Sequence, residues 1–364
     1  MKKIYFTVFN ELVYDQRMNR ICSTLAGKGF EITIVGKQLS SSPALLNENY
    51  KQHRLRCRFN KGKIHYIEFN IRLLFFLLFK KMNAICAVDL DTILPCYLIS
   101  RIRNIIRIYD AHELFTEMKE VVTRPFTKKI WMTIERLCVP AFTHGYTVSE
   151  SIAKVFHQRY GVRYEVIRNI PLKTDDPLPA PQKKIIIYQG AINEARGFEF
   201  LIPAMLHVDI PLHIYGNGNF EEKLYSLIEK HHIEGKVLVF PSQTPAVLKN
   251  ITREAYIGIN LVENTGLNQY YSLANKFFDY MHAGIPQITM QYPEYVEINT
   301  TYEVAVLIPE LNPASIAEAI HSLLTDTALY ERLRQNCLLA KEVFNWQNEE
   351  KKLVGFYRNL LQQY

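Results

Sequence analysis

Short β-rich runs alternate with helical patterns along almost the whole chain, and this alternation limits the possible fold more than any other feature. The first two runs are Lys3–Phe9 and Glu31–Val35, and the residues between them, Met18–Lys28, carry apolar side chains at helical spacing. Further strand-like runs end at Asp89, Asp110, Thr147 and Ile167. This alternation is typical of an α/β domain built on a parallel sheet.

A proline-rich stretch interrupts the alternation near the middle of the chain. Pro171–Gln182 (PLKTDDPLPAPQ) contains four prolines and no hydrophobic periodicity, which is the composition of a linker. The alternation begins again at Lys184–Gln189 and continues to a last helical segment at Gln347–Leu361. We therefore predict two α/β domains, at 1–172 and 183–346, followed by a C-terminal helix at 347–364.

Length and composition agree with two globular domains. The 364 residues are 48% hydrophobic and 22% charged, which excludes disordered and collagen-like chains. The longest unbroken apolar run, Leu73–Phe79, has seven residues, whereas a membrane-spanning helix needs about 20. The N-terminus lacks a signal-peptide pattern, and the six cysteines are scattered without zinc-ligand spacing. We expect a cytoplasmic protein with free thiols.

The charge is unevenly distributed. Residues 1–172 contain 27 basic and 14 acidic side chains, whereas residues 173–364 contain 16 and 22. Nine basic residues and one acid lie within 51–82, which ends in the apolar run. Basic and apolar residues together favour contact with an anionic membrane surface, and the alternative is a buried helix beside a solvated basic loop. No RNA-binding or zinc-finger motif accompanies the charge, so we do not expect nucleic acid as a partner.

Two segments of the second half have the residue types of a phosphate site. Gly190–Gly197 (GAINEARG) lies between a strand and a helix, where backbone amides approach phosphate closely and Arg196 adds a cation. Ser272–Pro286 (SLANKFFDYMHAGIP) places Lys276 and Asp279 on one face of a helix start, which suits a diphosphate and a ribose. The alternative for these two side chains is a surface ion pair.

At these segments the chain resembles the retaining nucleotide-sugar glycosyltransferases of family 4, which have the GT-B fold. The resemblance extends over almost the whole chain. The matching segments are 109–114 (YDAHEL), 147–152, 166–171, 190–197, 216–218 (GNG), 272–286 and 344–346 with the last helix. It implies two Rossmann-like α/β domains that face each other across a cleft, with the C-terminal helix returning to the N-terminal domain.

The resemblance also implies roles for individual residues. His112 would be the catalytic residue near the transferred sugar. The donor diphosphate would contact Gly190, Arg196, Ser272 and Lys276, and the ribose or sugar would contact Gly216, Asn275 and Asp279. Asp89, Asp91 and Glu113 are expected on the acceptor side, and an Asp-x-Asp metal site at Asp89 and Asp91 is not expected. The nucleotide diphosphate sugar would be a co-substrate, without metal or other cofactor.

The implied reaction is transfer, with retention, to a saccharide or lipid-linked saccharide in cell-surface polysaccharide synthesis, at the inner face of the membrane. The sequence departs from the family pattern at Ala191, where the family commonly has arginine, and at Tyr271, where it has glutamate. Phe9–Leu12 replaces the family's N-terminal Gly-Gly turn. Two alternatives therefore remain: an epimerase or hydrolase of nucleotide sugars, and a non-catalytic subunit that binds them.

Overall fold

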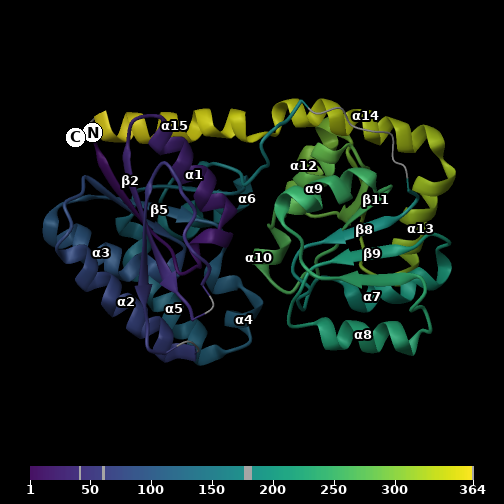
Figure 1. The fold of residues 1–364 in the computed structure, drawn as a ribbon, viewed down its shortest axis with the longest axis horizontal. Coiled ribbons are helices and arrows are strands. Elements are labelled where there is room, and N and C mark those ends of the chain that lie inside the picture. The colour runs from purple at the N-terminus through teal and green to yellow at the C-terminus, as the bar shows by residue number, and fades with distance from the viewer. Residues whose placement is uncertain (41, 60–61, 176–182, 363–364) are drawn as a thin grey trace. The chain divides into compact units, whose positions relative to one another are not determined.

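The computed structural model describes residues 1–40, 42–59, 62–175 and 183–362, which divide into two compact units (Figure 1). Unit 1 consists of residues 1–169 and those from Glu349 onward, and unit 2 of residues 170–348. The predicted linker, 171–182, lies partly outside the described residues. Each unit is built on one parallel sheet, so the predicted pair of α/β domains is confirmed.

Unit 1 contains a seven-stranded sheet in the order β3-β2-β1-β4-β5-β6-β7, with every described strand pairing parallel. The strands are β1 (Lys3–Thr7), β2 (Glu31–Gln38), β3 (Lys51–Arg56), β4 (Ala84–Val88), β5 (Ile106–Ala111), β6 (His144–Thr147) and β7 (Glu165–Val166). The strand order reverses between β1 and β4. In open parallel sheets, ligands bind at the carboxyl ends of the strands near such a reversal.

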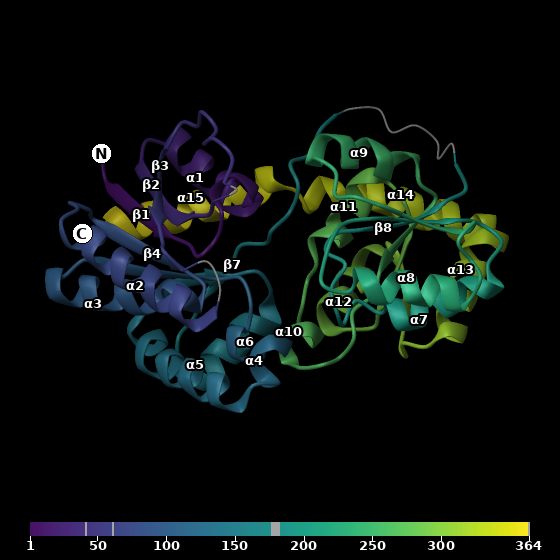
Figure 2. The same ribbon diagram turned by 60° about the horizontal axis from the view of Figure 1, so that its bottom comes forward.

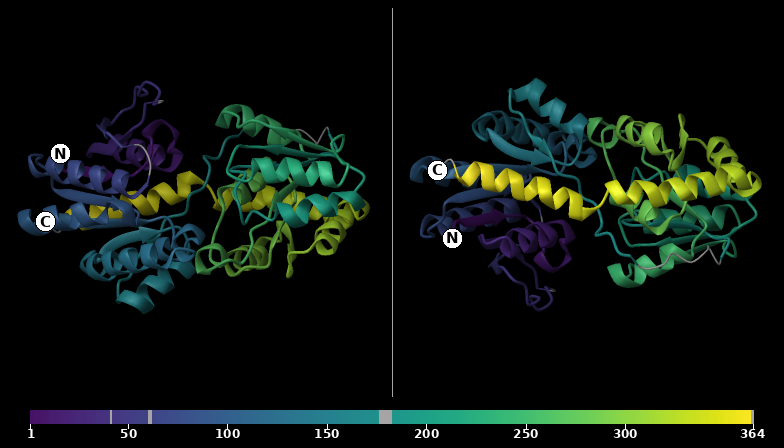
Figure 3. Two further views of the ribbon diagram at one scale, coloured as in Figure 1. Left: turned by 90° about the horizontal axis from the view of Figure 1, so that it is seen from below. Right: turned by 90° about the horizontal axis from the view of Figure 1, so that it is seen from above.

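Helices cover both faces of the unit 1 sheet. Thr7 Oγ1 on β1 lies 3.0 Å from Thr92 Oγ1 beside α3, whereas the neighbouring Phe6 packs on Tyr357 of α15. Because successive side chains of a strand point to opposite faces, α3 and α15 cover opposite faces. Figure 3 shows α15 in yellow along this unit. The helices are α1 (Gln16–Gly27), α2 (Gly62–Leu78), α3 (Ile93–Arg103), α4 (Lys119–Val122), α5 (Pro125–Cys138), α6 (Glu150–Tyr160) and α15 (Trp346–Gln362).

The basic and apolar segment 51–82 differs in part from the alternative of a buried helix beside a solvated basic loop. Its first residues form β3 at the edge of the sheet, so the expected solvated loop is wrong there. The apolar run continues α2, which buries Leu73 and Leu77 but leaves Phe75 and Leu78 exposed. No helix in the described part of the chain is long and apolar enough to cross a membrane.

Unit 2 contains a six-stranded parallel sheet in the order β10-β9-β8-β11-β12-β13. The strands are β8 (Ile186–Gln189), β9 (Leu212–Tyr215), β10 (Val237–Phe240), β11 (Ile257–Asn260), β12 (Gln287–Met290) and β13 (Ala305–Ile308). The helices are α7 (Phe198–Ala204), α8 (Glu221–Lys230), α9 (Pro245–Glu254), α10 (Leu267–Tyr270), α11 (Asn275–Ala283), α12 (Pro293–Tyr302), α13 (Pro313–Thr325) and α14 (Thr327–Val343).

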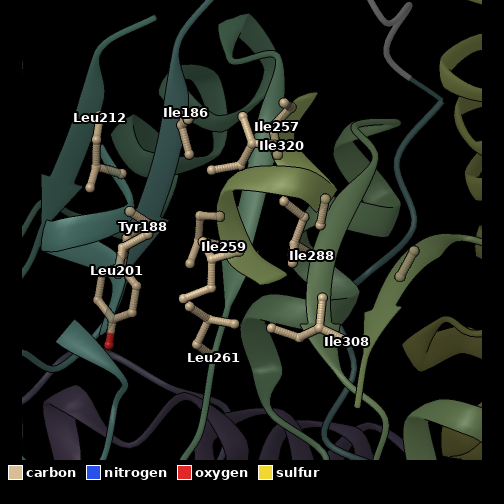
Figure 4. Packing of buried hydrophobic residues seen from close by; sticks show 14 of the residues in the cluster. Ile186, Tyr188, Leu201, Leu212, Ile257, Ile259, Leu261, Ile288, Ile308 and Ile320 are labelled. Carbon is tan, nitrogen blue, oxygen red and sulfur yellow. The ribbon is translucent and has the colours of Figure 1, made fainter. Parts of the chain in front are cut away.

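The core of unit 2 lies between the sheet and its helices. Figure 4 shows Ile186, Ile259 and Ile288 from three neighbouring strands beside Leu201 of α7 and Ile320 of α13. Ile187 instead joins a smaller cluster with Tyr280 of α11. Residues of α11 belong to both clusters, so this helix packs against the sheet, and Figure 2 shows α11 beside β8. The first turn of α11 lies at the carboxyl end of β8, because Lys276 is next to Gly190.

Candidate functional site

Tyr280 fixes helix α11 on the sheet of unit 2. Its hydroxyl lies 3.2 Å from the carbonyl oxygens of Ile187 and Ile259 and accepts a hydrogen bond from the Gln189 amide. The ring fills the space above Gly258, because a Cβ at that position would lie 2.5 Å from the ring. Tyr280 therefore links α11 to β8 and β11 and sets the position of the residues one turn earlier.

Lys276, in the first turn of α11, is a buried cation. Its side chain runs toward the glycine turn after β8, where a Cβ on Gly190 would lie 3.6 Å from Nζ. Nζ stands 3.6 Å from the centre of the Tyr188 ring, which is a cation–π contact. Among the described residues, no carboxylate forms an ion pair with this amine. The predicted alternative of a surface ion pair with Asp279 is therefore wrong.

The surroundings of Lys276 disfavour its charged form. Burial lowers its pKa well below the usual range, the nearby guanidinium of Arg196 lowers it further, and Asp279 opposes these effects only in part. Arg196 lies in the turn before α7 and has no ion pair among the described residues. Two neighbouring cations without a carboxylate partner form a site whose charge a bound anion would balance.

Asp279 lies one helical turn beyond Lys276 and is held by a hydrogen-bond chain. Gln189 Nε2 donates to Asp279 Oδ2 at 3.0 Å, and Gln189 Oε1 accepts from Thr252 Oγ1 at 2.6 Å. The chain joins β8, α9 and α11 and orients the carboxylate. A carboxylate held in this way can accept hydrogen bonds from the hydroxyls of a ligand.

The other predicted donor residues lie in the same part of unit 2. Gly216 packs on the glycine turn, since a Cβ there would lie 1.9 Å from the carbonyl oxygen of Gly190. Ser272 Oγ donates to the Gln269 carbonyl at 2.8 Å in the turn before α11, and Asn275 is exposed at the start of that helix. The packing requirement accounts for the glycine at 216 independently of any ligand.

In unit 1, His112 lies between two carboxylates at the carboxyl ends of β4 and β5. Its Nε2 is 3.1 Å from Asp110 Oδ2, and its Nδ1 is 3.4 Å from Asp89 Oδ2. The His112 backbone amide donates to Asp89 Oδ1 at 2.8 Å. Asp89 has a φ of 56°, which is uncommon for a residue with a side chain and marks this turn as constrained.

Arg17 completes this cluster from α1. Its guanidinium donates to Asp110 Oδ1 at 2.9 Å and to the Ile167 carbonyl at 3.1 Å. Burial alone raises the pKa of Asp110, but Arg17 and His112 together lower it below its usual value. Burial alone lowers the pKa of His112, but Asp110 and Asp89 raise it to about 9. The cluster therefore holds a buried imidazolium at neutral pH.

Asp91 and Glu113 flank the histidine cluster. Burial, and then the neighbouring Asp89, raise the pKa of Asp91 well above its usual value, whereas Lys37 opposes this. Asp91 Oδ1 is a buried atom without a hydrogen-bond partner among the described residues. Glu113 directly follows His112 after β5. Among the described residues, no group of three or more His, Cys, Asp or Glu side chains could hold a metal ion.

Comparisons with known proteins bear on the family of unit 2 and on the fold. Residues 171–338 match the family model described as "Glycosyl transferases group 1". The matched residues all lie within unit 2. No curated protein sequence matches the chain.

Solved structures with the GT-B fold resemble the whole chain. Sucrose-phosphate synthase (tll1590) from Thermosynechococcus elongatus has a TM-score of 0.83 at 14% identity, with 100% of both chains covered. Anabaena Alr3699/HepE, in complex with UDP and glucose, has a TM-score of 0.77 at 12% identity, also with 100% of both covered. WaaG, a glycosyltransferase involved in lipopolysaccharide biosynthesis, has a TM-score of 0.74 at 13% identity, with 96% of this chain and 98% of WaaG covered. These likenesses confirm the predicted GT-B fold.

Sequence reasoning missed several residues of these clusters. In unit 2, Tyr188 and Gln189 directly precede the glycine turn, and their place at the end of a strand was the available signal. In unit 1, Asp110 belongs to the same YDAHEL segment as His112. No sequence pattern marks Arg17 as a partner of Asp110, because only folding brings α1 next to β5.

Proposed function

We propose that this protein is a retaining glycosyltransferase that uses a nucleotide diphosphate sugar as donor. The observation that carries the proposal is Lys276, a buried amine beside Arg196 that lacks a carboxylate partner among the described residues. A diphosphate would supply the missing negative charge. The match of residues 171–338 to the group 1 family model supports the same assignment, and so does the fold shared with HepE, which has been solved with UDP-glucose.

Donor binding would use the charge and hydrogen-bonding groups of unit 2. The diphosphate would contact Lys276, Arg196, the Gly190 backbone and Ser272. Asp279, oriented by Gln189, would accept hydrogen bonds from the ribose hydroxyls, and Asn275 and Gly216 would border the ribose or sugar. Because a bound anion favours the charged form of a lysine, nucleotide binding would raise the pKa of Lys276.

Transfer would form a bond between the sugar's anomeric carbon and an acceptor oxygen as the bond to the diphosphate breaks. Lys276 and Arg196 would stabilise the negative charge that develops on the leaving diphosphate. The acceptor's proton would pass to an oxygen of that leaving group. Asp110 is paired with Arg17, and Asp89 accepts a hydrogen bond from the His112 backbone amide, so neither of these two carboxylates is free to act as a nucleophile. Same-face attack, with retention, is the course that the resemblance to family 4 implies.

His112 would orient the transferred sugar through its imidazole. Its Nε2 is buried against Asp110, whereas its Nδ1 contact with Asp89, at 3.4 Å, is longer than a hydrogen bond. Nδ1 is therefore the nitrogen that would donate to a sugar hydroxyl. Asp89, Asp91 and Glu113 would border a saccharide or lipid-linked saccharide acceptor. We place the reaction in cell-surface polysaccharide synthesis at the cytoplasmic face of a membrane, which the six buried, unbridged cysteines support.

The proposal is tested by a thermal-shift panel of UDP, GDP, ADP and their sugars. A ligand present at about 100 times its Kd stabilises the folded state by about 2.7 kcal/mol, which corresponds to a rise in Tm of about 5–10 °C. We expect one nucleotide to give such a shift selectively. A panel without any shift would contradict the proposal.

Turnover separates the proposal from its two alternatives. With the selected donor and a mixture of saccharide acceptors, nuclear magnetic resonance of the product should show the anomeric configuration of the donor. Donor consumption at the same rate without acceptor would indicate an epimerase or hydrolase. Binding without consumption under any condition would indicate a non-catalytic subunit.

Tyr188 offers a second test of the donor site. Replacing it with leucine removes the ring face above Lys276, and we expect nucleotide Kd to rise roughly five- to thirtyfold, corresponding to about 1–2 kcal/mol of cation–π energy. Tyr188→Phe is the matched control, because it keeps the ring and loses only the hydrogen bond to the Ala191 carbonyl. We expect its Kd to stay within about threefold of the unsubstituted protein. Equal losses in both variants would show that the hydroxyl, and not the ring, supports binding.

A further inference from the structure

Three neighbouring helices of unit 1 leave large apolar side chains exposed on their outer sides. Figures 1 and 2 show α2, α3 and α5 side by side on one face of the sheet. We name their exposed residues the apolar face: Ile64, Ile67, Ile71, Phe75 and Leu78 on α2, Leu98 and Ile102 on α3, and Phe126, Ile130 and Leu137 on α5. Exposed apolar patches of this kind mark interaction surfaces.

Helix α2 shows most clearly that the apolar face is not ordinary helix surface. Its buried stripe runs through Phe69, Leu73 and Leu77, as expected for a helix on a sheet. The opposite stripe, which faces solvent, runs through Ile67, Ile71 and Phe75, and Phe75 is 60% exposed. A surface helix normally carries polar residues on that side. An apolar stripe on both sides indicates that a partner other than water covers the outer one.

Helix α5 extends the same surface. Phe126, Ile130 and Leu137 repeat at helical spacing on its exposed side, and Phe126 is 69% exposed. The N-terminal parts of the two helices are in contact. Lys63 Nζ of α2 lies 5.1 Å from the centre of the Phe126 ring of α5, and the Tyr66 and Trp131 ring centres are 5.9 Å apart. The apolar side chains of α2 and α5 therefore belong to one continuous surface.

The charges around the apolar face are almost entirely positive. Helices α2, α3 and α5 carry seven basic residues, Lys63, Arg72, Arg101, Arg103, Lys128, Lys129 and Arg136, and two acidic ones, Glu68 and Glu135. Glu135 is buried, and Glu68 accepts hydrogen bonds from Arg72 and from two backbone amides. Glu68 therefore balances Arg72, and Glu117 pairs with Lys128 at 3.7 Å, which leaves an excess of positive charge.

A groove beside α5 concentrates this charge. It has a volume of about 420 Å³ and is lined by Lys128, Lys129 and Arg136 together with Val122, Pro125, Met132 and Thr133. Basic side chains and apolar walls in one groove suit a phosphate joined to a hydrocarbon. The groove opens on the same helix that carries Phe126 and Ile130.

We propose that the apolar face binds the surface of an anionic lipid bilayer. The apolar side chains would enter the boundary between headgroups and acyl chains, while Lys129 and Arg136 would contact lipid phosphates. A second copy of the chain fits less well, because a symmetric dimer through this face would bring like charges together. The proposal does not depend on the proposed function, because no nucleotide or saccharide takes part in it.

The test is co-sedimentation of the full chain with vesicles of phosphatidylcholine alone or with about a third phosphatidylglycerol. At an ionic strength of about 0.15 M we expect the unsubstituted protein to bind the anionic vesicles at least tenfold more strongly. The double variant Ile71→Ser with Phe75→Ser should lose at least tenfold in partitioning. Lys129→Gln with Arg136→Gln should weaken binding and make it less dependent on salt.

Matched controls come from exposed residues of unit 2. Leu339→Ser with Val343→Ser changes two exposed apolar residues at the same spacing on α14, and Lys184→Gln with Lys230→Gln removes two exposed charges. Both control variants should bind vesicles as the unsubstituted protein does. Equal binding to neutral and anionic vesicles would overturn the proposal, and so would equal losses in control and test variants. A dimer that forms without vesicles and is abolished by Ile71→Ser with Phe75→Ser would also overturn it.

Discussion

Lys276→Met is expected to raise the Kd of the nucleotide donor roughly 10- to 100-fold. The substitution removes the charge but keeps most of the buried side-chain volume. It would delete a charge-assisted contact with the diphosphate, and such contacts contribute about 1.5–3 kcal/mol. Isothermal titration calorimetry with the nucleotide selected by the thermal-shift panel measures the loss directly.

The same variant should be at least as stable as the unsubstituted protein when no nucleotide is bound. Lys276 is buried beside Arg196, so a charged amine there is unfavourable until an anion arrives. A rise in the Tm of the free protein, together with a loss of the nucleotide-induced shift, would distinguish a binding residue from a structural one. A residue that serves packing alone would give the opposite result for the free protein.

Lys223→Ala is the control for this experiment. Lys223 lies in the same unit, but it is exposed and pairs with Glu194 at 3.6 Å. Removing such a surface charge should change nucleotide affinity by less than about twofold. Unchanged affinity in Lys276→Met, or an equal loss in Lys223→Ala, would contradict the assignment of Lys276 to the diphosphate.

The architecture could be predicted from the sequence because apolar residues alternate between strand-like and helix-like spacing, and this spacing is a local signal. The runs Lys3–Phe9 and Glu31–Val35 became strands β1 and β2, and the last helical segment, Gln347–Leu361, lies within α15. Lys276 and Asp279 could be predicted to share a face because helical spacing alone sets that relation. The burial of Lys276 could not be predicted, because it depends on Tyr188 from another element.

Relations between distant segments account for what the sequence did not reveal. Arg17 and Asp110 are 93 positions apart, and neither has a local pattern that indicates a buried ion pair. Helix α2 shows a different limit. Both of its stripes are apolar, so hydrophobic periodicity could not separate the buried side from the exposed one. The sequence therefore left two alternatives: the buried helix describes only one side of α2, and contact with a membrane stays a prediction.

Asp110→Asn is expected to destabilise unit 1 by about 3–5 kcal/mol. Asp110 is fully buried between Arg17 and His112, and removing its charge leaves two buried cations without their common partner. Hydrogen exchange of the segment Ala84–Ala111, measured by mass spectrometry, reports the stability of unit 1 separately from that of unit 2. Glu31→Gln is the control, because Glu31 forms only exposed pairs with Lys3 and Lys51. It should cost less than about 1 kcal/mol.

The loss of unit 1 stability in Asp110→Asn should also depend on pH in a defined direction. The pKa of His112 is raised from 6.5 to about 9 in the folded protein, so its contribution to stability is complete below pH 6.5. It declines as pH rises and is lost above about pH 9. The pKa of Asp110 is lowered from 3.8, so its contribution is present above pH 3.8 and is lost as pH falls through its folded value. The variant should therefore differ most from the unsubstituted protein between about pH 4 and 6.5.

Nuclear magnetic resonance titration of His112 provides the decisive readout. Loss of the Asp110 charge should move the pKa of His112 downward from about 9. Burial lowers this pKa, and in the variant only Asp89 remains to raise it. A merely structural effect of the substitution would lower stability by the same amount at pH 5.5 and pH 9.5 and leave this titration in place. That result would show that the charge of Asp110 is not what raises the pKa of His112.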